Sequence, residues 1–158
     1  MKNTLKYGKK ADLALGLWVK LARASSTFGK ATAMNIKSFG LTEPQFAVLE
    51  CLGHLGPLTF GELSKKMLVS SGNITVVVDN LEKNSIVERV HNKEDRRSIH
   101  VLLTQKGKTL FDGIFRKHAE IITQAASALT EEEQKTLSQL LKKLGLSLQA
   151  QSQTINKL

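Results

Sequence analysis

The stretch TFGELSKKMLVSSGNITVVVDNLEKNSIVERVHNKEDRRSIHVLLT, residues 59–104, decides the fold that this sequence predicts. Residues 59–62 have the spacing of a capping box, in which the first and fourth side chains cap the start of a helix. That helix is expected to stop at a short break over 69–72, and a second one continues to about Asn84. The side of the second helix expected to be buried carries Ile74, Val77, Val78 and Leu81. Two short helices joined by a tight turn are typical of a helix-turn-helix.

After the second helix the pattern changes to short runs rich in Ile and Val. Residues 86–90 and 99–103 are two such runs, and the polar segment between them predicts a β-hairpin with a long tip. Helix, helix and hairpin in this order form a winged helix-turn-helix. With the helix expected to begin at the Thr42 capping box, the lobe covers residues 42–104.

Long amphipathic helices are predicted on both sides of this lobe. Apolar residues recur at helical spacing between 11 and 38 and again between 131 and 148, with a further helix from Thr104 to about Ala128. We therefore expect a mainly α (α+β) fold: one domain over 1–158, with the lobe at 42–104 and long dimerisation helices at 11–40 and 105–148. A lone lobe is too small to cover both leucine-rich stripes, which favours a homodimer.

The composition favours a polyanionic partner. Among 158 residues, 23 are Lys or Arg and 14 are Asp or Glu, a net charge of +9, which on a small chain points to nucleic acid. The excess lies mainly in residues 1–40, whereas the residues 59–97 are nearly balanced. One cysteine, no signal-like start and no long apolar run indicate a cytoplasmic, nucleoid-associated protein rather than a secreted or membrane protein.

Double-stranded DNA fits the predicted lobe. An α-helix enters the major groove with its first residues at the base edges, and here those residues are Ser71, Asn73, Thr75 and Val76. The hairpin tip would follow the neighbouring minor groove, whose negative potential attracts arginine. Its basic residues are Arg96 and Arg97, and Asp95 is placed to brace the guanidinium of Arg97.

The chain resembles the MarR (multiple antibiotic resistance regulator) family of transcriptional regulators. The resemblance is carried by Gly61-Glu62-Leu63-Ser64, by the run VVVDNLE at 76–82 and, most specifically, by DRRSIHVLLTQKG at 95–107. It implies a homodimer built on the terminal helices that binds a pseudo-palindromic operator. By motif, Ser71, Asn73, Thr75 and Val76 match the base-reading residues and Arg97 matches the wing arginine. Asn80 departs from the family's usual arginine, so a contact made by that arginine is in doubt here.

Members of the family commonly respond to a small phenolic or aromatic anion, to cysteine oxidation or, rarely, to zinc. An effector pocket is expected between the helices around the lobe, with candidate residues Trp18, Phe46, His54, Phe111 and Phe115. Redox sensing would have to use Cys51, which has no nearby base in sequence to lower its pKa. The four histidines are not clustered, so no metal and no other cofactor is expected.

Catalysis finds no support, because the sequence lacks a phosphate-binding loop, a nucleophile elbow and a metalloprotease motif. We therefore expect a DNA-binding transcriptional regulator, most simply a repressor released by a small aromatic or phenolic ligand. Two alternatives remain open. One is a winged-helix module that binds protein instead of an operator, and the other is a regulator that responds to oxidation of Cys51.

Overall fold

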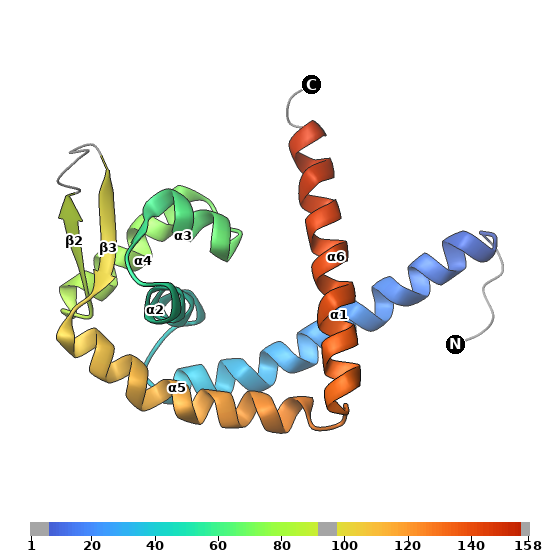
Figure 1. Ribbon diagram of the computed structural model, residues 1–158, viewed down its shortest axis with the longest axis horizontal. Helices are drawn as coiled ribbons and strands as arrows, with labels where there is room; N and C mark the ends of the chain where they lie inside the picture. The colour runs from blue at the N-terminus through green and yellow to red at the C-terminus, as the bar shows by residue number, and fades with distance from the viewer. Residues whose placement is uncertain (1–6, 92–97, 156–158) are drawn as a thin grey trace. The chain divides into compact units, whose positions relative to one another are not determined.

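The computed structural model describes residues 7–91 and 98–155, apart from the side chains of Ser71 and of 152–155. Of these described residues 77% are helical, and three strands among them form one small antiparallel sheet (Figure 1). The predicted mainly α, winged-helix fold class is therefore confirmed. The chain forms two compact units, one ending at Ile121 and the other beginning at Ile122.

The elements follow the predicted order, with different ends. The helices are α1 (Lys9–Ser38), α2 (Glu43–Leu55), α3 (Phe60–Met67), α4 (Ser71–Lys83), α5 (Gln105–Ala126) and α6 (Glu131–Ile155). The strands are β1 (Leu58–Thr59), β2 (Val87–His91) and β3 (Ile99–Leu103). Strand β1 was not expected, α4 begins inside the predicted break, and α6 continues beyond residue 148.

Reciprocal caps fix the starts of three helices, α2, α3 and α6. At α3 the Thr59 backbone N–H donates to Glu62 Oε2 at 2.8 Å, and the Glu62 backbone N–H donates to Thr59 Oγ1 at 3.3 Å. The same arrangement opens α2 at Thr42 and α6 at Thr130. Each cap satisfies donors that a helix start otherwise leaves unpaired. The hydrogen bonds from Thr59 also lower the pKa of the Glu62 carboxyl.

The sheet joins the helix-turn-helix to the hairpin. Strand β3 lies between β1 and β2, with Leu58 opposite Val101 and Arg89 opposite Val101 from the other side. Beneath the sheet, one side of α4 packs into the core through three fully buried side chains, Ile74, Val78 and Leu81. In Figure 1 α3 and α4 stand on one side of the β2–β3 hairpin, and α5 leaves from the foot of β3. The core thus holds α4 in place while its opposite side remains exposed.

Two residues other than glycine have positive φ in the described ranges, Leu68 at 56° and Ser85 at 55°. Ser85 follows α4 and turns the chain into β2. Because a side chain in this left-handed region crowds the backbone, Ser85→Gly is expected to raise the free energy of unfolding by about 0.5–1 kcal/mol. Urea denaturation measures the change. Ser138→Gly, in the middle of α6, is the matched control and should destabilise the protein.

Candidate DNA-binding surface and effector cavity

Helix α4 presents a polar, exposed face at its start. Asn73 and Thr75 are exposed, and the Val76 side chain is 61% exposed although valine is usually buried. The N-cap residue Ser70 makes no side-chain cap, and no acidic residue lies in the first turn. The start of α4 therefore offers amide, hydroxyl and methyl groups together with the positive end of the helix dipole. The structure brings Asn73, Thr75 and Val76 to one end of one helix, as predicted; the Ser71 side chain is not described.

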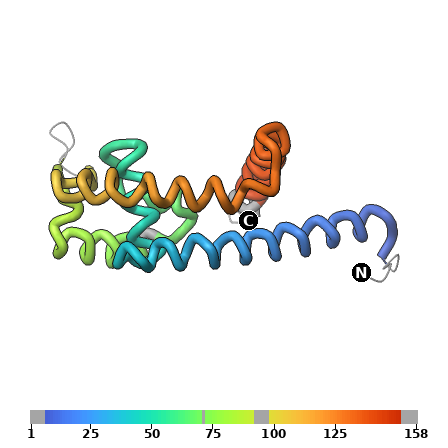
Figure 2. The backbone as a smooth tube through the Cα atoms, turned by 90° about the horizontal axis from the view of Figure 1, so that it is seen from below, coloured from blue at the N-terminus to red at the C-terminus, as the bar shows by residue number. Residues whose placement is uncertain are grey.

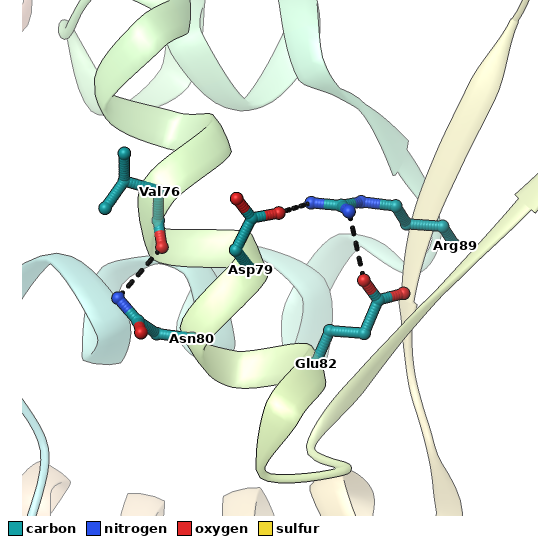
Figure 3. A network of polar contacts seen from close by, with 5 residues as sticks. All are labelled: Val76, Asp79, Asn80, Glu82 and Arg89. Carbon is teal, nitrogen blue, oxygen red and sulfur yellow. Dashed lines mark hydrogen bonds and ion pairs between the residues drawn. The ribbon is translucent and has the colours of Figure 1, made fainter.

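Arg89 links α4 to the wing (Figure 3). Its Nη2 pairs with Asp79 Oδ1 and its Nη1 lies 3.0 Å from Glu82 Oε2, both on α4. The guanidinium also lies 5.4 Å from the centroid of the Phe60 ring, at the start of α3. One side chain on β2 thus contacts both helices of the helix-turn-helix.

Arg89 is not among the residues that the sequence predicts for the site, although the sequence contains a signal for it. Val87 and Arg89 lie on the same side of β2 because side chains alternate along a strand, and Val87 is buried. A positively charged residue on a buried face of a strand needs an acidic partner. Asn80 takes no part in this network: its Nδ2 donates to the Val76 carbonyl oxygen at 3.0 Å, as Figure 3 shows.

The predicted wing residues Asp95, Arg96 and Arg97 lie outside the described residues. The strands that lead to the tip are described and run from Val87 to His91 and from Ile99 to Leu103. Their five paired positions form a regular hairpin base. The roles of Asp95, Arg96 and Arg97 stay predictions.

Of the five candidate effector residues, Phe46 and Phe111 line two different hollows, and Trp18, His54 and Phe115 line neither of them. His54, Phe111 and Phe115 form one ring cluster, with centroid distances of 4.5–5.2 Å. Phe111 lines a hollow of about 400 Å³ between α2, β3 and α5. Phe46 lines a different one and stacks near His118, with ring centroids 4.5 Å apart. Trp18 is 65% exposed on α1 and makes no ring contact with these residues in the described chain.

The hollow beside Phe46 has a volume of about 480 Å³ and is formed by α1, α2 and α5 with the end of α3 and the turn before α4. Its lining consists of Thr32, Ile36, Glu43, Pro44, Phe46, Ala47, Glu50, Met67, Val69 and His118. Figure 2 shows α1 and α5 side by side along this part of the chain. There His118 Nδ1 lies 2.9 Å from Asn35 Oδ1 and joins the two helices. We call this hollow the α1–α2–α5 cavity.

His118 was also missed by the sequence argument, although it follows the buried Ile114 by one helical turn. Its burial lowers the pKa of the imidazole, and the nearby Glu50 carboxylate opposes this shift. The folded protein therefore holds the ring neutral under conditions in which the unfolded chain, with a His pKa of about 6.5, binds a proton.

We accordingly expect the free energy of unfolding to fall as the pH is lowered through about 6.5, the usual histidine pKa. The stabilisation by neutral His118 is complete above the unfolded pKa and is lost towards the lower folded pKa. Urea denaturation between pH 8 and pH 5 measures this slope. His118→Gln keeps a polar group and removes the titration, so its profile should be flatter; equal slopes for the two proteins would contradict the prediction.

The surroundings of Cys51 disfavour the reactive thiolate that a redox sensor needs. It is half-buried on α2, and burial together with the Glu50 charge raises the pKa of its thiol, with Lys66 opposing the shift. A raised pKa leaves less of the reactive thiolate. In the described ranges no group of three or more His, Cys, Asp and Glu residues could hold a metal ion. Nor does any helix there have the length and apolar character needed to cross a bilayer.

Known proteins match this chain over most of its length. Residues 41–99 match the MarR family model. The chain is 37% identical to the HTH-type transcriptional regulator MhqR of Bacillus subtilis, over 86% of this chain and 94% of MhqR. It is 36% identical to the uncharacterized HTH-type transcriptional regulator YkoM of the same organism, over 89% of this chain and 92% of YkoM.

Among solved structures, Bordetella bronchiseptica BpsR matches with a TM-score of 0.72 and 26% identity, over 82% of this chain and 98% of that one. The DNA binding of BpsR is regulated by 6-hydroxynicotinic acid. MarR-family members bind DNA as dimers, and some bind small-molecule ligands. The winged helix-turn-helix described above and the identity to full-length relatives show that this chain belongs to the MarR family of HTH-type transcriptional regulators.

Proposed function

We propose that the protein is a homodimeric repressor that binds a pseudo-palindromic operator in double-stranded DNA and is released by a small aromatic or phenolic molecule. In this proposal the residues 42–104 form the DNA-binding lobe, and the terminal helices, over 11–40 and 105–148, form the dimer. The protein acts on the chromosome in the cytoplasm and has no enzymatic activity. The observation that carries the proposal is the exposed start of α4, held by a buried core on its other side.

The chemistry of that surface suits base edges in the major groove. Asn73 can pair bidentately with adenine, Thr75 can donate or accept, and an exposed Val76 can contact a thymine methyl group. Ser71 completes this set. Arg96 and Arg97 follow the minor groove, with Asp95 holding Arg97 in one orientation. Because few phosphate-binding cations lie in the lobe, the basic α1 is expected to contribute to the attractive field.

Exposed apolar residues support the dimer. On α1, Leu13, Leu17 and Trp18 are 68%, 56% and 65% exposed, and on α6 Leu140 and Leu146 are 59% and 56% exposed. Such rows of large apolar side chains on a small protein mark an interaction surface. A two-fold axis would bury both rows and place the two lobes on successive half-sites of DNA.

Selection of bound fragments from random duplex DNA tests the proposal. A palindromic winner is expected, and its affinity should fall steeply with salt as counterions are released. A winged helix that binds protein would yield no enriched sequence and need not show this salt dependence, which separates the two alternatives. If the protein responds to oxidation of Cys51, peroxide should change operator binding of the wild type but not of Cys51→Ser. We expect instead that mild oxidation leaves operator binding of the wild type unchanged.

Asn73→Ala is expected to weaken operator binding by about 1 kcal/mol through loss of a base contact. Helix α4 should remain folded, because alanine is a good helix former. Fluorescence anisotropy on the selected operator measures the change, and Gln124→Ala, an exposed amide outside the lobe, is the control. Arg97→Ala tests the wing in the same assay. Wild-type affinity for Asn73→Ala would remove this residue from the recognition surface.

A further inference from the structure

The polar side chains that line the α1–α2–α5 cavity all offer hydrogen-bond acceptors, which indicates the class of molecule that fits it. Its size, about 480 Å³, is in the range of small-molecule sites. The apolar side chains of Ile36, Phe46 and Met67 form part of its wall. The chemical identity of a ligand is therefore decided by the few polar groups that face the cavity.

His118 offers the cavity an acceptor. The side chain is only 7% exposed and lines the cavity, so it is a polar group more than nine-tenths buried. Since the Asn35 amide oxygen, 2.9 Å away, can only accept, the proton of the neutral ring lies on Nδ1. The second nitrogen, Nε2, then carries a lone pair, and within the described chain no residue donates to it.

Thr32 offers a second acceptor. Its hydroxyl group donates to the Gly29 carbonyl oxygen at 2.9 Å, as is common for threonine inside a helix. The single hydroxyl proton is thereby used within α1, and only the lone pairs of Oγ1 remain for a ligand.

Glu43 and Glu50 add negative charge. Both line the cavity from α2, and no ion pair with either is found in the described part of the chain. None of the lining residues is Lys or Arg. The Glu50 carboxylate also lies close enough to His118 to oppose the lowering of the imidazole pKa by burial. An anionic ligand would meet two like charges, and a neutral acceptor would find no side-chain cation.

We propose that the α1–α2–α5 cavity binds an organic cation, specifically a protonated amine attached to an aromatic or other apolar body. The ammonium group donates to the acceptors at Glu50, Glu43 and His118, and the apolar body lies against Phe46. An aromatic ring face also attracts a cation. The proposal rests on the proposed function and deepens it, since it names the chemical class of the effector as a cation instead of the phenolic or aromatic anion that is common in the family.

Calorimetry on the free protein tests this without DNA. The probes share one phenethyl frame and differ in charge: 2-phenylethylamine is a cation, 2-phenylethanol is neutral and phenylacetate is an anion. We expect the amine to bind about tenfold or more tightly than the alcohol, as a charge-assisted hydrogen bond allows, and phenylacetate to bind weakest. Equal affinity for the amine and the alcohol, or a preference for phenylacetate, would overturn the proposal.

Glu50→Gln localises the effect. It keeps the shape of the side chain and removes the charge, so the preference for the amine over the alcohol should fall about tenfold. Glu120→Gln removes one charge from an exposed position of α5 that does not line the cavity, and should leave the preference unchanged. An unchanged preference in Glu50→Gln would refute the site. Failure to select an operator would instead refute the proposed function, and the calorimetric result would stand.

Discussion

Gly107→Ala is expected to destabilise the lobe by about 3 kcal/mol, because the added methyl group has no room. Gly107 lies in the first turn of α5, and a Cβ there would stand 2.0 Å from the Ile86 carbonyl oxygen and 3.4 Å from the Leu103 Cβ. The obstacle is backbone and cannot rotate away. The Ile86 carbonyl accepts from the Thr104 backbone N–H at 3.1 Å, and the Ile86 N–H donates to Leu81 at 2.9 Å. Moving it would disturb the junction of α4, β2, β3 and α5.

Urea denaturation measures this loss, and the same helix provides the control. A Cβ on Gly113 would meet nothing within 4 Å, so Gly113→Ala should stabilise the protein by up to about 1 kcal/mol through helix propensity. Opposite changes in the free energy of unfolding for two Gly→Ala substitutions on the same helix cannot both come from helix propensity. A Gly107→Ala protein as stable as the wild type would show that α5 can move away from the hairpin at little cost.

The sequence was sufficient to predict those parts of the fold that depend on local chemistry. Capping boxes at Thr42, Thr59 and Thr130 mark helix starts because the two capping groups are three residues apart, and the structure has all three. The hairpin followed from two β-branched runs. These signals need no knowledge of distant residues.

Other parts depend on contacts between distant residues. Strand β1 has two residues, and Leu58 and Thr59 are extended because β3 pairs with them 43 and 41 residues later in the chain, at Val101 and His100. No periodicity can be read from two residues. The left-handed conformation of Ser85 is likewise set by the turn between α4 and β2 and not by its own preference.

The residues of the candidate sites also fall into those that local sequence patterns predict and those that depend on contacts between distant residues. The exposed start of α4 could be predicted, since helical periodicity separates Asn73, Thr75 and Val76 from the buried Ile74 and Val78. The sequence predicts the effector residues only as aromatic residues on the helices around the lobe, because it does not give the directions of their side chains. Phe46 and Phe111 are both on those helices but line different hollows, and the acceptor His118 depends on Asn35, 83 residues away.

Arg89→Met is expected to weaken operator binding about tenfold or more and to lower the free energy of unfolding by about 2 kcal/mol. Methionine keeps an apolar stem over Phe60 and removes the cation shared by Asp79 and Glu82. Without this cation the negative charges of the two carboxylates on α4 repel each other. The side chains of Asp79 and Glu82 are 43% and 37% exposed, so water screens part of this repulsion. The core still holds α4, but the polar link that aligns α4 with β2 is lost, so base and wing contacts fit the DNA together less well.

The salt dependence of binding decides whether Arg89 positions the lobe or touches DNA. A phosphate contact contributes about one unit to the slope of log affinity against log salt. Because Arg89 is occupied by Asp79 and Glu82, we expect Arg89→Met to lower the affinity with the slope unchanged. A double-mutant cycle with Asp79→Asn should show a coupling energy of about 0.5–3 kcal/mol in stability, and Arg116→Met, an exposed arginine on α5, is the control. A slope reduced by one unit, with no coupling to Asp79, would make Arg89 a DNA contact and leave the link between α4 and the wing without a role.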